Sequence, residues 1–176
     1  LDIEEEAKEA GITSFCSKPL FLSELRSCLH SIVNAEETEG QKSEEKSEKR
    51  YTGRILLAED NELNQEIAVA ILGNAGFTTE VAMNGKIAVE MLEKSEPGYY
   101  QLVLMDVRMP VMDGYEATKL IRSLDNAKLS SIPILAMTAN AFEEDRQEAL
   151  RSGMNGHLAK PIDVEALFDA LDKILK

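Results

Sequence analysis

The chain has 176 residues and a formal charge of −13, from 32 Asp and Glu against 19 Lys and Arg. Such an acidic chain lacks the basic surface that nucleic acid requires, and an anionic membrane surface would repel it. No apolar run approaches the roughly 18 residues that cross a bilayer, and two cysteines, Cys16 and Cys28, make no disulfide framework. We therefore expect a cytoplasmic protein with no nucleic-acid partner and no direct membrane contact. Another segment of a parent protein could still tether it to a membrane.

The first 33 residues repeat the end of the chain. Residues 6–29 align with residues 148–171, and both segments carry a glycine followed, after six residues, by Lys-Pro. They are predicted to be the C-terminal remnant of another copy of the domain that follows. Because the chain also begins at Leu1 rather than Met, we expect it to be a fragment of a longer protein.

Residues 34–50 differ in composition from both neighbours. They hold six acidic and four basic residues and no large aliphatic side chain, so they cannot bury a face. This pattern predicts a charged linker, with a lengthened helix as the alternative.

Residues 51–176 alternate between short apolar segments and longer segments with helical spacing. Apolar strands without strict alternation are buried on both faces, which is typical of a parallel sheet covered by helices. Five such units predict one doubly wound α/β domain. Asp113 is predicted to cap a helix, with Glu116 as its partner. The predicted strands are 54–58, 77–82, 102–105, 132–137 and 156–158.

Polar residues follow four of these strands. Glu59 and Asp60 follow the first, Asp106 the third and Lys160 the fifth, and Thr138 ends the fourth. The carboxyl ends of parallel strands share one edge, where ligands bind in open α/β sheets. These five residues are therefore predicted to form one site, although a threonine in such a place is also a common helix cap.

Three carboxylates so close together repel, by about 4 kcal/mol for each pair at 4 Å and an effective dielectric constant near 20. An all-oxygen set without His or Cys selects a hard divalent cation, and Mg²⁺ fits a site that also receives a phosphate. Asp106 could then act as a carboxylate nucleophile, while Lys160 neutralises a phosphoryl oxygen.

Four ordered motifs closely resemble the receiver domains of two-component signalling, most of all those attached to hybrid sensor histidine kinases. They are AEDNELNQ (58–65), LMDVRMPVMDGYEAT (104–118), MTAN (137–140) and GHLAKPID (156–163). The resemblance implies a flavodoxin-like five-stranded parallel sheet in the order 2-1-3-4-5, with helices on both faces.

The resemblance also implies a role for each site residue. Asp106 would be the phospho-acceptor, and Thr138 and Lys160 would bind the phosphoryl group. The Lys160–Pro161 peptide would be cis. The Mg²⁺ ligands would be Glu59, Asp60, Asp106 and the backbone carbonyl of Arg108.

His157 departs from the commonest pattern, because receivers usually have Tyr or Phe there as a rotating switch residue. We keep His157 as a switch candidate beside the simpler interpretation of a packed surface histidine. In the family, the residues at Arg108 and Asn140 also influence the phosphoryl lifetime.

We therefore expect a phosphorelay module that receives phosphate from the phosphohistidine of a histidine kinase or of a histidine phosphotransfer domain. Dimerisation through residues 142–175 is a further expectation. No ATP-binding motif is present, so any kinase activity would lie elsewhere in a parent histidine kinase. The alternatives are a phosphate-independent interaction module and the receiver of a free-standing response regulator.

Overall fold

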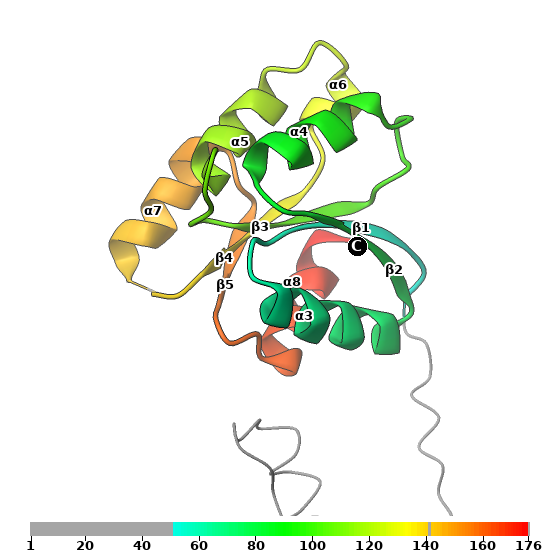
Figure 1. Ribbon diagram of the computed structural model, residues 1–176, viewed down its shortest axis with the longest axis vertical. Helices are drawn as coiled ribbons and strands as arrows, with labels where there is room; N and C mark the ends of the chain where they lie inside the picture. The colour runs from blue at the N-terminus through cyan, green and yellow to red at the C-terminus, as the bar shows by residue number, and fades with distance from the viewer. Residues whose placement is uncertain (1–50, 141, 176) are drawn as a thin grey trace, which may run out of the picture. The chain divides into compact units, whose positions relative to one another are not determined.

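The computed structural model of the chain describes residues 51–140 and 142–175. The predicted remnant at residues 1–33, the predicted linker at 34–50 and both cysteines lie outside the described residues. Five parallel strands form one sheet in the order β2-β1-β3-β4-β5, as the resemblance implies (Figure 1). The strands are β1 (Gly53–Ala58), β2 (Phe77–Ala82), β3 (Leu102–Asp106), β4 (Ile134–Thr138) and β5 (Gly156–Ala159).

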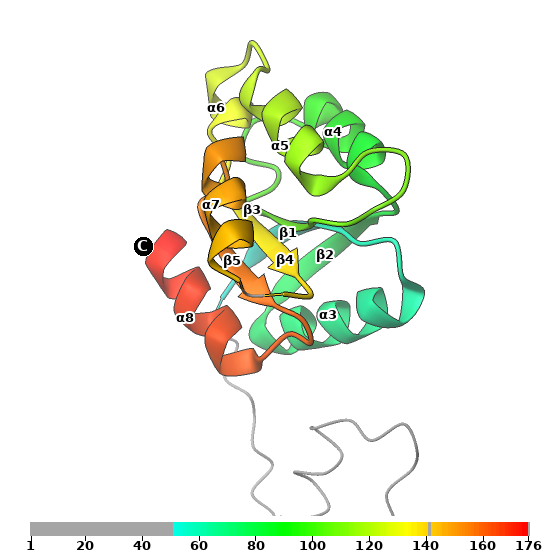
Figure 2. The ribbon, with the colours of Figure 1, turned by 90° about the vertical axis from the view of Figure 1, so that its left-hand side faces the viewer.

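Helices cover both faces of this sheet (Figures 1 and 2). On one face lie α3 (Glu62–Ala75) and α8 (Val164–Ile174). On the other lie α4 (Gly85–Lys94), α5 (Gly114–Arg122), α6 (Ala127–Ser130) and α7 (Glu143–Ser152). The predicted doubly wound α/β fold is thus confirmed.

The central strands are apolar on both sides because each contributes side chains to two separate hydrophobic cores. In β1, Leu56 and Ala58 pack with α4 and α5, whereas Ile55 and Leu57 pack with α3 and α8. Strands β3 and β4 alternate in the same way and are buried throughout. The edge strand β2 is only partly buried along its length.

Local sequence fixes most of the helix ends. Asp113 caps α5, as predicted, and its side chain accepts the N–H of Glu116 at 2.8 Å. Gly76 ends α3 with φ of 108°, a left-handed conformation in which glycine avoids a steric penalty.

Four of the five strands differ from their predicted bounds by one or two residues at one or both ends. Strand β4 begins at Ile134 rather than Ile132, next to Pro133, which has no N–H to donate to the sheet. The four-residue helix α6 was not predicted, because it is too short to show helical periodicity.

Candidate functional site

Backbone pairing beyond the strand ends brings the predicted site residues to one edge of the sheet. The Glu59 N–H donates to the Ala82 carbonyl at 3.0 Å, one residue past the end of β1. The Lys160 N–H donates to the Thr138 carbonyl at 2.8 Å, one residue past the end of β5. The ladder therefore continues far enough to carry Glu59 and Lys160 into the site.

The three predicted carboxylates converge. Each of Glu59, Asp60 and Asp106 offers an oxygen, and these oxygens lie within 4.8 Å of one another. Glu59 and Asp106 are buried, with exposures of 2% and 4%, while Asp60 is exposed. One side of the cluster is thus enclosed by protein and the other is open to solvent.

Lys160 joins the two buried carboxylates. Its Nζ lies 2.6 Å from Oε2 of Glu59 and 2.8 Å from Oδ2 of Asp106. The Lys160–Pro161 peptide bond that leads away from this side chain is cis, as the resemblance implies.

Burial and the lysine act in opposite directions on the acceptor. Burial raises the pKa of the Asp106 carboxyl above its usual value, and the hydrogen bond from Lys160 offsets part of that rise. For Lys160, burial alone would lower the pKa of the ammonium, but its hydrogen bonds to Asp106 and Glu59 outweigh this and raise it. The lysine is therefore held as a cation beside both carboxylates.

The donor set fits a hard divalent cation. All three converging groups offer carboxylate oxygens, which suit Mg²⁺ and similar ions. Asp106 is further oriented by the Arg108 N–H, which donates to its Oδ1 at 3.1 Å. The predicted ligand role of the Arg108 carbonyl stays a prediction.

Thr138 lies at the site edge, but its hydroxyl is engaged locally. Its Oγ1 donates to the Asn140 carbonyl at 2.8 Å and accepts the Asn140 N–H at 3.2 Å. It does not cap a helix, because the N-cap of α7 is Phe142. The hydroxyl would have to leave the Asn140 backbone to bind a phosphoryl group.

His157 points to a neighbouring helix. The Arg146 Nε–H donates to His157 Nε2 at 3.0 Å, so this ring nitrogen is an acceptor and carries no proton. Partial burial, followed by the positive charge of Arg146, lowers the pKa of the imidazole. His157 therefore links β5 to α7.

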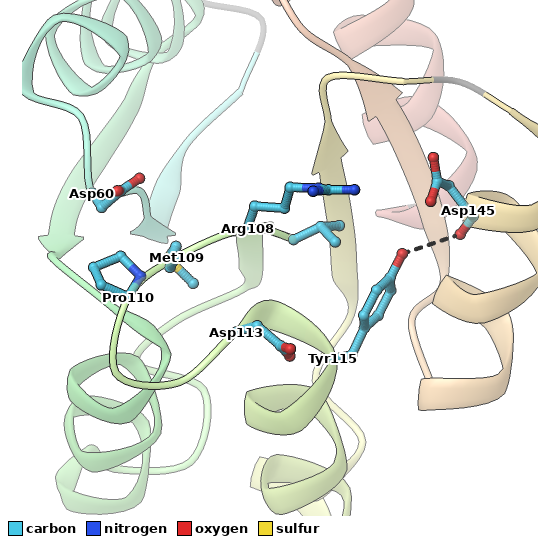
Figure 3. A pocket seen from close by; sticks show the side chains of 8 residues that line it. Asp60, Arg108, Met109, Pro110, Asp113, Tyr115 and Asp145 are labelled. Atoms are coloured by element: carbon cyan, nitrogen blue, oxygen red, sulfur yellow. Dashed lines mark hydrogen bonds between the residues drawn. The ribbon is translucent and has the colours of Figure 1, made fainter.

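A hollow of about 540 Å³ opens beside Asp60 and the loop that follows β3 (Figure 3). Its far wall is formed by Tyr115 of α5, whose hydroxyl donates to the main-chain oxygen of Asp145 in α7 at 3.5 Å. The sequence did not single out Tyr115 or Asp145, since they come from segments that meet only in the folded chain.

The sequence also did not single out two side-chain amides, those of Asn64 and Gln65, that contact Glu59. The Asn64 side chain donates to Oε1 of Glu59 at 3.3 Å, and the Gln65 side chain donates to the Glu59 carbonyl at 2.7 Å. Their positions in AEDNELNQ, close to Glu59 and at the start of a predicted helix, are the sequence feature that could have identified them as neighbours of the site.

The class of protein is therefore a doubly wound α/β domain with an acidic cluster and one lysine at the carboxyl edge of its parallel sheet. Comparison with known proteins then gives the family. The model of the response regulator receiver domain matches residues 55–172, and the chain belongs to this family.

The curated relatives of this chain include histidine kinases. The chain is 32% identical over 178 residues to probable histidine kinase 6 of Oryza sativa subsp. japonica, covering 90% of this chain and 18% of that protein. It is 44% identical over 118 residues to hybrid signal transduction histidine kinase B of Dictyostelium discoideum, covering 62% of this chain and 6% of that protein. The aligned region thus spans only a small part of these curated relatives.

Two solved receiver structures are also similar. The receiver domain of sensor histidine kinase PA1611 from Pseudomonas aeruginosa, which holds magnesium in its active site cleft, is 39% identical, with a TM-score of 0.63 and coverage of 71% of this chain and 98% of that chain. The Saccharomyces cerevisiae receiver of Ssk1, crystallised with the histidine phosphotransfer protein Ypd1, is 30% identical, with a TM-score of 0.63. That match covers 70% of this chain and 88% of that chain.

Within residues 51–140 and 142–175, none of the helices has the length and apolar character needed to span a membrane.

Proposed function

We propose that this receiver domain accepts a phosphoryl group on Asp106 from a phosphohistidine. The observation that carries the proposal is the convergence of two carboxylates, those of Glu59 and Asp60, on Asp106, which Lys160 contacts at 2.8 Å. Glu59, Asp60, Asp106 and the Arg108 carbonyl would hold Mg²⁺, which would supply positive charge against the carboxylates and the incoming phosphoryl oxygens. The magnesium-bound receiver of the Pseudomonas kinase supports this assignment.

The reaction is an in-line displacement. A carboxylate oxygen of Asp106 forms a bond to phosphorus while the bond from phosphorus to the donor imidazole nitrogen breaks, and that nitrogen keeps the electron pair. Phosphoryl transfer depends mainly on positioning and charge neutralisation. The hydrogen bonds from the Arg108 N–H and from Lys160 fix both oxygens of Asp106 and so supply the positioning.

The proposal is tested by intact-protein mass after incubation with acetyl phosphate and Mg²⁺. We expect the gain of one phosphoryl group, abolished in Asp106→Asn and by EDTA. No gain, together with no detectable Mg²⁺ binding, would contradict the proposal and favour a phosphate-independent interaction module.

Lys160 is proposed to couple the phosphoryl group to the rest of the domain. Once phosphate is present, we expect Lys160 and the Thr138 hydroxyl to bind its oxygens, which would change the face formed by residues 142–175. Lys160→Ala should still accept phosphate but show a much weaker change in amide hydrogen exchange across that face. A variant that responds like the wild type would refute this role.

The wider setting is a hybrid histidine kinase in a phosphorelay. The similarity to the rice protein and to histidine kinase 2 of Arabidopsis thaliana covers 90% and 97% of this chain and so reaches into residues before 51. The order that we propose is a receiver remnant (1–33), a linker (34–50) and the receiver (51–176). The yeast complex supports a histidine phosphotransfer domain as the kind of partner.

A further inference from the structure

The Glu59 carboxylate is held from two sides. Its Oε1 accepts the Asn61 N–H at 3.1 Å and the Asn64 side-chain amide at 3.3 Å. Its Oε2 accepts the Lys160 ammonium at 2.6 Å. One oxygen therefore faces the start of α3, and the other faces the ammonium that also contacts Asp106.

The start of α3 explains why Asn64 is available for this contact. Asn61 is the N-cap, and its side chain accepts the Asn64 backbone N–H at 3.1 Å. In a capping box, the third helical residue reaches back to the N–H of the cap residue. Here Glu59 accepts that N–H instead, and the Asn64 side chain turns to Glu59.

The surroundings of Asn64 are mostly apolar. Asn64 lines a small hollow of about 40 Å³ together with Ile67, Met137 and Ile162, with Glu59 and Lys160 on its polar side. A cavity of this size has room for about one water. An apolar side chain of similar size in place of Asn64 would remove the donor from Oε1 of Glu59.

We propose that Asn64 is a positioning residue that holds Oε1 of Glu59 and thereby sets the affinity of the site for Mg²⁺. The inference rests on the proposed function, because it takes the acidic cluster as a magnesium site. Asn64 is not itself a ligand: its amide acts through Glu59, as hydrogen-bonding partners behind metal ligands do elsewhere.

The test is calorimetric titration of the domain with Mg²⁺ alone, for the wild type, Asn64→Leu and the matched control Asn74→Leu. Asn74 lies exposed in the last turn of the same helix, away from the site. We expect Asn64→Leu to weaken Mg²⁺ binding roughly tenfold and Asn74→Leu to leave it unchanged. Phosphoryl acceptance by Asn64→Leu from acetyl phosphate should return to the wild-type extent once Mg²⁺ is saturating.

The outcomes separate this inference from the proposed function. Equal Mg²⁺ affinity in wild type and Asn64→Leu overturns the positioning role alone, and so does an acceptance defect that saturating Mg²⁺ fails to rescue. A wild-type protein that binds no Mg²⁺ overturns the metal site as well. If circular dichroism shows that Asn64→Leu does not fold, Asn64→Ala carries the same titration, because alanine removes the donor and favours helix.

Discussion

At the scale of single residues, the hydrogen bond between Arg146 and His157 gives the predicted switch position a polar partner. The neutral imidazole accepts the guanidinium N–H at 3.0 Å, and an added proton on Nε2 would break that bond. Phenylalanine could not accept it at all. The position thus serves here as a polar link between β5 and α7.

This link predicts a dependence of stability on pH. Burial and Arg146 lower the pKa of His157 in the folded state. As pH falls from about 7, the unfolded chain, with a histidine pKa of about 6.5, takes up the proton first. The stability of the wild type should therefore fall through this range and down to the folded-state pKa.

His157→Gln provides the comparison, because glutamine keeps an acceptor and does not titrate. Urea unfolding of both proteins between about pH 7.5 and 5 should show the wild type losing stability relative to the variant as the pH falls. A constant difference across this range would be inconsistent with a lowered pKa for His157.

The identities of the site residues could be predicted from the sequence, whereas their present contacts could not. Glu59, Asp106 and Lys160 follow apolar strands, and strand ends in a parallel sheet share an edge. The Thr138 bond to Asn140 depends on the backbone conformation just after β4, which no periodicity encodes. The Arg146 contact with His157 depends on two elements meeting in the fold.

At the scale of elements, α5 begins directly against the acceptor strand. The Gly114 N–H donates to the Val107 carbonyl at 3.0 Å, and a Cβ at Gly114 would lie 2.3 Å from the Asp106 carbonyl oxygen. Only glycine allows this approach, so the motif that includes Asp113 and Gly114 has a structural role beside its place in the family pattern.

Gly114→Ala should therefore destabilise the domain by about 1–3 kcal/mol, through a clash with backbone that cannot move aside. Gly73→Ala is the control, since nothing lies within 4 Å of a Cβ there and the residue is within α3. The control should instead stabilise by about 0.5–1 kcal/mol. Chemical denaturation measures both, and equal effects of the two changes would refute the close-contact argument.

At the scale of the whole molecule, the strand order and both helical layers were predictable, because β-α alternation and the motif resemblance agree. The surface was less predictable. Phe142 and Leu150, at the start and near the end of α7, are 69% and 63% exposed. The dimer through residues 142–175 stays a prediction, and these apolar side chains would lie in its interface.

We expect the phosphorylated domain to self-associate and the double variant Phe142→Ser, Leu150→Ser to weaken that association at least tenfold. Both side chains are exposed, so the variant should stay folded. Analytical sedimentation measures the effect, with Leu120→Ser on α5 as the control for loss of an exposed leucine. A phosphorylated wild type that stays monomeric would contradict the dimer.

The two cores on opposite sides of the sheet have a consequence for how this sequence can diverge. Among the described residues, no buried side chain belongs to both cores, and only strand backbone lies between them. A change in the packing of α3 and α8 therefore needs no compensating change beneath α4 or α5. Each layer is free to drift at its own rate, so a lineage could acquire a new recognition surface on one side while the other side stays as it was.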